Sequence, residues 1–105
     1  MSLKIKKDFR EVKKIELKSL PGGELEIYSG TLFKDSHIFN DLVNKPYDPM
    51  TFLKSICLCI HSWNFVGEDD KELPVCEESL AMIKPEAIHE LSQAIIAFAQ
   101  EKKNP

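Results

Sequence analysis

Long hydrophobic runs are missing from this sequence. Its longest apolar stretches, such as residues 55–60 and 94–99, fall far below the roughly 20 residues that a helix needs to cross a lipid bilayer. The N-terminal segment is basic and contains no apolar stretch like that of a secretory signal. We therefore expect a cytoplasmic protein with no membrane span.

Cysteine and glycine are also scarce, and neither occurs in a functional pattern. The three cysteines, Cys57, Cys59 and Cys76, are odd in number, and two of them are separated by one residue. This argues against the disulfide framework of small secreted domains and predicts reduced thiols. The four glycines match no nucleotide-binding fingerprint, and no histidine has a serine or cysteine at a spacing that suggests a catalytic triad. The sequence thus predicts neither catalytic activity nor a cofactor.

One cluster of side chains has the chemistry of a zinc site. Cys57, Cys59 and His61, with Cys76 further along, offer the thiolate and imidazole ligands that Zn²⁺ favours. On a helix Cys57 and His61 share a face, whereas Cys59 points about 200° away from Cys57 at roughly 100° per residue. We therefore expect the thiols to pack like small hydrophobic side chains, without a metal. The acidic run at residues 68–72 lacks the ligand pattern of a calcium-binding loop and is typical of a solvated turn.

Charge is unevenly distributed along the 105 residues. The formal net charge is −3, but lysines gather near the N-terminus and carboxylates gather between residues 68 and 78. Nucleic-acid binding through the basic segment is therefore one alternative. Apart from Phe9 no aromatic residue interleaves with the basic residues, and Asp8 and Glu11 dilute their charge. A flexible, solvated basic tail over residues 1–12 is the favoured interpretation.

Length and composition predict a single domain of the α+β class over residues 1–105. A hydrophobic content of 43% and a charged content of 30% are ordinary for a globular domain of this size. Apolar residues alternate with polar neighbours in two runs, at Ile15, Leu17, Leu25 and Ile27. Because such alternation is typical of half-buried strands, and turn formers at 19–23 separate the runs, we expect an antiparallel β-hairpin over residues 13–29.

Residues 30–102 are expected to be mainly helical, as a small bundle of three to four helices. A short helix is predicted within residues 31–43. Asp48 followed by Pro49 then supplies the N-cap and the first residue of a longer helix that continues to Trp63. This helix is indicated by apolar residues at spacings of three and four, namely Phe52, Ile56, Cys59, Ile60 and Trp63.

The C-terminal part of the chain is expected to hold an acidic loop and two helices. The loop, at residues 64–75, contains a small turn between two short extended pieces and precedes one or two helical turns at 77–82. Pro85 begins a final helix. Its apolar stripe comprises Ala87, Leu91, Ala94, Ile95 and Phe98. The predicted core of the domain contains Phe52, Ile56, Ile60, Trp63, Leu91, Ile95 and Phe98.

Two segments of the chain resemble phage tail assembly chaperones. Trp63-Asn64-Phe65 is followed by an acidic turn, by Glu72-Leu73-Pro74-Val75, by two glutamates and by a proline-initiated amphipathic helix, as in that family. Leu17-Lys18-Ser19-Leu20-Pro21-Gly22 is similar to the Leu-Pro-Ser-Leu-Pro-Gly opening common in those proteins. The resemblance covers residues 13–100.

The sequence departs from the family pattern at two positions. Lys18 stands where the family has its first proline. Cys76 stands where a threonine would cap the following short helix, so a weaker cap is expected there. Neither change touches catalysis, so the class of function that the resemblance implies is unaffected.

The resemblance implies a non-catalytic phage or prophage protein of the host-cell cytoplasm. Such a protein binds the long, helical tape measure protein and helps the tail tube proteins assemble around it; self-association is left open. The candidate partner-binding residues are Phe33, Phe39, Trp63, Phe65, Asp69 and Asp70. The alternative is a small regulatory domain that binds nucleic acid through its basic N-terminal segment, and a zinc-dependent module comes third.

Overall fold

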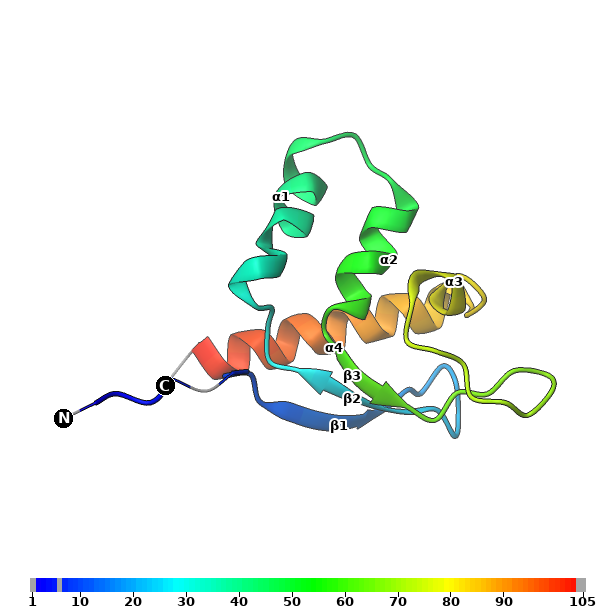
Figure 1. Ribbon diagram of the computed structural model, residues 1–105. Coiled ribbons are helices and arrows are strands. Elements are labelled where there is room, and N and C mark those ends of the chain that lie inside the picture. Colours follow the sequence, from blue (N-terminus) through cyan, green and yellow to red (C-terminus); the bar gives the residue numbers. More distant parts are fainter. Residues whose placement is uncertain (1, 6, 104–105) are drawn as a thin grey trace.

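The computed structural model describes residues 2–5 and 7–103 and has the expected α+β fold (Figure 1). In chain order the elements are β1 (Val12–Glu16), β2 (Glu24–Tyr28), the 3₁₀ helix η1 (Phe33–Asp35), α1 (Ser36–Asn44), α2 (Pro49–Cys57), β3 (Ile60–Trp63), α3 (Glu77–Leu80) and α4 (Pro85–Lys103). The strands form an antiparallel sheet in the order β1-β2-β3. In Figure 1 α4 runs behind this sheet, and α1 and α2 stand side by side above it.

The N-terminal hairpin forms as the alternation predicts. β1 and β2 pair antiparallel, with Ile15 opposite Leu25. Since successive side chains of a strand point to opposite faces, Leu25 and Ile27 share one face, and both are buried there. They belong to one core cluster with Leu17 and with side chains of α2 and α4. The hairpin is therefore the base on which the rest of the domain packs.

The final helix, α4, begins at Pro85 as predicted and supplies much of the core. Its buried side chains recur at spacings of three and four, at Ala87, Leu91, Ile95 and Phe98. Ala94 packs against the same cluster while partly exposed. Among the residues that the structure describes, no helix is both long and apolar enough to cross a membrane.

The prediction of one continuous helix over residues 49–63 is wrong. Asp48 caps the start of α2 with a side-chain hydrogen bond, as expected, but the helix ends at Cys57. The chain then turns and adds β3 to the edge of β2, with Trp63 opposite Leu25. Residues 60–63 follow the helical spacing of apolar residues, but their pairing with β2, which is distant in sequence, outweighs this local preference. The sheet consequently has a strand that the apolar spacing did not predict.

The predicted core is correct at five positions and only partly correct at two. Ile56, Ile60, Leu91, Ile95 and Phe98 are buried. Phe52 and Trp63 pack against this cluster but remain partly exposed. Trp63 lies on β3, which is an edge strand of the sheet.

Arg10, at a position where the sequence predicts a flexible tail, is held against the sheet. Its guanidinium donates two hydrogen bonds to the Asp8 carboxylate, at 3.0 and 2.8 Å, and one to the Leu58 carbonyl, at 2.9 Å. It also lies 3.5 Å from the centre of the Tyr28 ring, and its side chain is 7% exposed. These contacts join the N-terminal segment to β2 and to the turn before β3, and the Arg10 guanidinium lowers the pKa of Asp8 to about 2.

Replacing Arg10 by alanine is expected to lower the free energy of unfolding by about 2 kcal/mol, because the change leaves the Leu58 carbonyl without its charged donor. Arg10→Lys keeps the charge but lacks the planar fork, so it should recover only part of this loss. Urea unfolding of the three proteins measures both differences. An alanine variant as stable as the wild type would show that this contact network contributes nothing.

Candidate partner-binding groove

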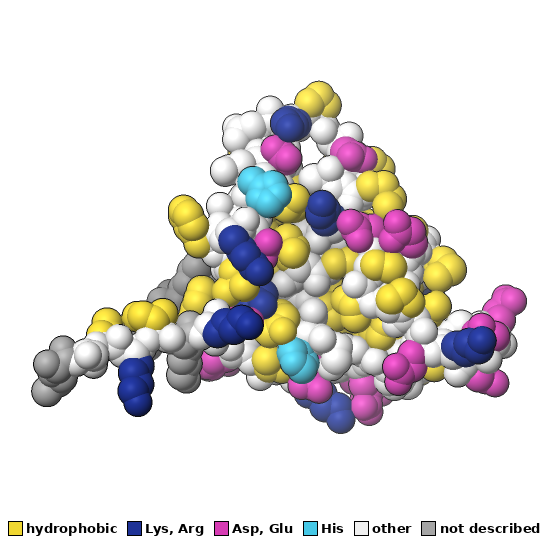
Figure 2. Space-filling view, in the orientation of Figure 1, with side chains coloured by type: hydrophobic (Ala, Val, Ile, Leu, Met, Phe, Trp, Pro, Cys, Tyr) yellow, Lys and Arg dark blue, Asp and Glu magenta, His cyan; other side chains and the backbone are white. Residues whose placement is uncertain are grey.

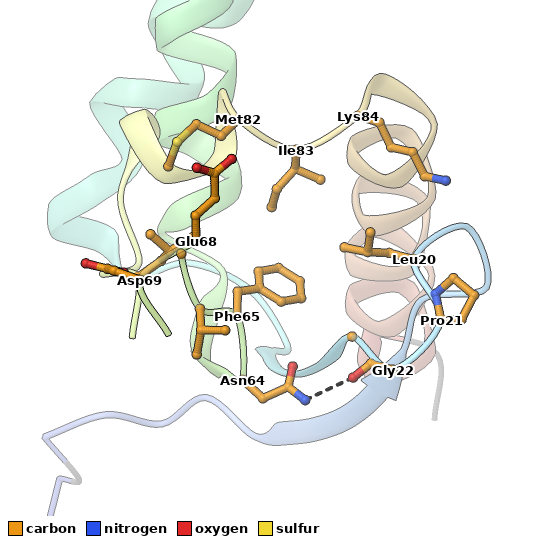
Figure 3. Close-up of a pocket in the computed structure, with 14 residues that line it drawn as sticks. Leu20, Pro21, Gly22, Asn64, Phe65, Glu68, Asp69, Met82, Ile83 and Lys84 are labelled. Carbon is orange, nitrogen blue, oxygen red and sulfur yellow. Dashed lines mark hydrogen bonds between the residues drawn. The ribbon is translucent and has the colours of Figure 1, made fainter. Parts of the chain in front are cut away.

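A groove opens between the hairpin turn (residues 19–23), the acidic loop (residues 64–75) and the connection from α3 to α4 (Figure 3). Its volume is about 1020 Å³. Apolar side chains from all three segments line it, namely Leu20, Pro21, Phe65, Leu73, Met82 and Ile83. Phe65 and Ile83 point into the space between these segments. We call this surface the turn groove.

The hairpin turn forms one wall of the turn groove and needs its two glycines. Gly22 has a φ of +89°, a left-handed conformation that other residues rarely adopt. A Cβ atom at Gly23 would lie 2.9 Å from the Phe65 ring and 3.0 Å from the Leu20 carbonyl oxygen. The first glycine is therefore required by the turn, and the second by the close approach of Phe65.

Asn64 ties the acidic loop to the hairpin. Its backbone N–H donates to the Glu24 carbonyl at 3.1 Å, and its side-chain oxygen accepts from the Glu24 N–H at 2.9 Å. Its side-chain nitrogen donates to the Gly22 carbonyl at 2.9 Å (Figure 3). Three hydrogen bonds from one residue thus fix the separation of the two walls.

Trp63 supports the acidic loop from the sheet. Its indole N–H donates to the Leu73 carbonyl at 2.8 Å, and its ring stacks on Phe65 with 4.9 Å between ring centres. The Leu73 N–H in turn donates to the Phe65 carbonyl at 3.0 Å, and Val66 bridges to Glu72. The two short extended pieces that the sequence predicts in this loop are therefore confirmed. Trp63 holds both, so that Phe65 faces the groove.

The carboxylates of the acidic loop lie at the groove and at the loop tip. Glu68 and Asp69 line the turn groove, whereas Asp70 forms the tip with a φ of 62°. An Asp69 carboxylate oxygen accepts from the Lys71 N–H at 3.1 Å, and the Gly67 N–H donates to the Lys71 carbonyl at 2.9 Å. The loop therefore presents its negative charge in a defined conformation.

The other two predicted aromatics lie away from the turn groove. Phe39, in α1, lines a separate hollow of about 610 Å³ together with Phe9 and Ile96. Phe33, in η1, is 92% exposed. The structure thus brings Trp63 and Phe65 together with the acidic loop. Phe33 and Phe39 lie outside the turn groove.

Several groove residues were not among the sequence candidates. Leu20 and Pro21 appear in the sequence analysis as part of a turn and of the segment that carries the family resemblance. Met82 appears there only as the end of the predicted helical turns at 77–82, and Ile83 lies just beyond them. The signal that could have identified the first pair is an apolar residue inside an otherwise turn-forming stretch. The second pair carries no local signal, because it joins the site only through the tertiary fold.

The thiols have the chemistry of packing residues. Burial raises the pKa of Cys57 to about 12 and that of Cys59 to about 11, so both thiols stay protonated near neutral pH. The helical geometry used above to separate Cys57 from Cys59 does not apply, because Cys59 follows the end of α2. Within the described part of the chain, no group of three histidine, cysteine or acidic side chains could hold a metal ion.

Three basic residues near the N-terminus are paired within the chain. The Lys13 Nζ atom lies 3.4 Å from a Glu101 carboxylate oxygen, and the Lys14 Nζ atom lies 3.2 Å from a Glu24 carboxylate oxygen. Arg10 is paired with Asp8, as described above. Exposed pairs of this kind are weak, but each reduces the positive potential offered to a phosphate backbone.

Glu90 of α4 ties the hairpin turn to that helix. Its carboxylate accepts hydrogen bonds from the Lys18 N–H at 2.7 Å, from the Ser19 N–H at 2.9 Å and from the Ser19 hydroxyl at 2.6 Å. Lys18 stands where the resembled family has proline, and proline has no N–H to donate. Lysine at position 18 therefore allows a backbone hydrogen bond to Glu90 that proline could not donate.

These hydrogen bonds should make stability depend on pH through Glu90. The Ser19 and Lys18 donors hold the pKa of Glu90 below its usual range, so its contribution is present above the unfolded-state pKa and is lost as pH falls through the folded-state pKa. The stability gap between the wild type and Glu90→Gln should therefore close as the pH falls below the ordinary pKa of a glutamate and through the lowered folded-state pKa of Glu90, as followed by urea midpoints. Glu86→Gln, in the exposed first turn of α4, is the control variant. If the gap between the wild type and Glu90→Gln does not change with pH, the role given to the Glu90 carboxylate is contradicted.

Comparison of the chain with models of protein families, with curated proteins and with solved structures finds no match.

Proposed function

We propose that this protein is a phage tail assembly chaperone that binds the tape measure protein in the host-cell cytoplasm and helps the tail tube proteins assemble around it, without catalysis. One observation carries the proposal. The two segments whose sequences resemble that family, residues 17–22 and 63–75, are distant in the chain but form facing walls of the turn groove.

The chemistry of the turn groove suits a helical partner. The tape measure protein, the partner of these chaperones, is a long helical chain with an apolar surface, and it must be kept soluble before the tail tube encloses it. Helix-in-groove recognition needs an apolar floor for buried anchors and a polar rim. Phe65, Leu20 and Ile83 offer apolar lining for such anchors, and Glu68 and Asp69 offer carboxylates in the same groove.

Co-expression with the tape measure protein of the same phage tests the proposal directly. We expect the chaperone to raise the soluble fraction of the tape measure protein and to co-purify with it. Phe33→Ala, which removes an exposed aromatic away from the groove, should behave like the wild type. If the wild-type protein neither raises the soluble fraction of the tape measure protein nor co-purifies with it, the chaperone assignment is removed.

The nucleic-acid alternative has less support, because Arg10, Lys13 and Lys14 are paired with carboxylates of the same chain. It makes a separate prediction, which is retention on DNA that collapses as salt is added. Retention on DNA at low salt that falls steeply as salt is added would favour this alternative over the chaperone.

The acidic loop is expected to set the rate of association more than the lifetime of the complex. Asp69→Asn with Asp70→Asn should slow association roughly threefold to tenfold at low salt and leave dissociation nearly unchanged, because rim charges steer encounter. Asparagine can accept the Lys71 N–H and tolerates the positive φ of residue 70, so the loop should keep its shape.

Stopped-flow binding at two salt concentrations measures this effect. The matched control removes two carboxylates from α1 and its N-cap, through Asp35→Asn with Asp41→Asn, and should change association much less. If the two double variants associate at the same rate, net charge and not the acidic loop governs encounter.

A further inference from the structure

A second apolar groove meets the turn groove at Ile83. It lies between α2, α3 and α4 and has a volume of about 450 Å³. Tyr47, Met50, Leu53 and Ile88 line it, and Ile83 lines both grooves. We call this second surface the helix groove. The connection from α3 to α4 thus contributes to both surfaces.

Large apolar side chains stay exposed along this path. Tyr47 is 74% exposed, Met82 is 68% exposed and Met50 is 44% exposed. Figure 2 shows hydrophobic side chains gathered around α3, with acidic side chains along their margin. Both methionines of the described residues lie on this path, and flexible thioether side chains adapt to differing apolar partners. Such a surface suits a partner that presents many similar helical segments.

The two grooves differ in charge. Glu68 and Asp69 line the turn groove, together with Lys84. Within the described chain, the residues that line the helix groove include no carboxylate, and His89 is its one imidazole. Negative charge is therefore concentrated at one end of the combined path, and a complementary partner needs positive charge at one end only.

We infer that the turn groove and the helix groove together take one amphipathic helix, whose basic end lies at the acidic loop and whose uncharged end lies between α2 and α4. This inference rests on the proposed function, because it takes the helix to be a segment of the tape measure protein. It adds the second groove, the direction of the charge gradient and the chemistry of the segment that is bound.

Photo-crosslinking tests the inference with the full chain and its tape measure protein. A benzophenone side chain is introduced singly at Val66 in the turn groove, at Met82, at Tyr47 in the helix groove, and at Phe33 as the control. All four positions are exposed, so folding should be unaffected. We expect the first three to crosslink to one stretch of the length of a single helix, with the Val66 contact nearest its lysines or arginines, and the Phe33 control to give none.

The outcomes separate this inference from the proposed function. Suppose that the tape measure protein co-purifies and crosslinks at Val66. If it does not crosslink at Tyr47, or crosslinks there through a distant segment, the single-helix path is overturned and the chaperone assignment stays intact. Absence of co-purification removes both. Should the Tyr47 photo-reactive variant fail to fold, Tyr47→Ser decides: it should weaken binding roughly threefold to tenfold, while Val43→Ser, 81% exposed on α1, should not. Equal affinities would overturn the inference.

Discussion

Phe65→Ala is expected to weaken binding of the tape measure protein about thirtyfold, mainly by faster dissociation, since a central aromatic anchor typically contributes about 2 kcal/mol or more. The ring faces the turn groove from the acidic loop, and its contacts with Trp63 and with the backbone at Gly23 hold it in place before binding. A side chain that is already ordered loses little entropy on binding, which favours its use as an anchor.

Kinetic binding measurements test this expectation, and two controls make the result interpretable. Phe33→Ala deletes an equal side chain at a position 92% exposed and outside the turn groove, so its dissociation rate should match the wild type. Because Phe65 also stacks on Trp63, the unfolding curve of Phe65→Ala must show a folded protein at the temperature of the assay. A folded variant with an unchanged dissociation rate would place the anchor elsewhere.

The hairpin and α4 could be predicted because their signals are local. Apolar residues at Leu25 and Ile27 alternate with polar ones, which predicts a strand with one buried face. After Pro85, apolar residues recur at spacings of three and four, which predicts an amphipathic helix. In both cases the buried side chains come from one continuous segment, so a short window of sequence holds the full pattern.

β3 could not be predicted because its residues fit two structures. Ile60 and Trp63 continue the spacing of α2, but they also pair with β2 across more than thirty residues of sequence, as the Leu25–Trp63 register shows. Local spacing does not report the hydrogen-bonding edge that β2 offers. The choice between helix and strand is made by that edge and not by the local pattern.

The groove depends on tertiary structure even more strongly. Phe65 and Asp69 were candidates because an aromatic residue and charges stand together in the sequence, whereas Leu20 and Ile83 reach the same surface from other parts of the chain. Asn64 and Glu90 position the two walls through contacts with the hairpin turn that no spacing rule contains. Of the six sequence candidates, Phe65 and Asp69 line the turn groove, and the shape of the groove could not be predicted from the sequence.

Trp63→Ala is expected to lower the free energy of unfolding by about 3 kcal/mol, the lower part of the range for deleting a large aromatic side chain, because the ring is only partly buried. Three contacts are lost together: the packing against the core, the stacking with Phe65 and the hydrogen bond to the Leu73 carbonyl. Against a total of about 5–15 kcal/mol for a domain of this size, such a loss should be visible in the melting temperature.

Trp63→Phe separates packing from hydrogen bonding. Phenylalanine keeps a ring beside Phe65 but has no N–H for the Leu73 carbonyl, so this variant should lose only about 1 kcal/mol. Because that hydrogen bond holds the acidic loop to the sheet, hydrogen exchange at the Leu73 amide should accelerate in Trp63→Phe more than exchange in α4. Unchanged thermal stability in Trp63→Ala would mean that the acidic loop and the sheet hold together without this side chain, and that the turn groove does not depend on it.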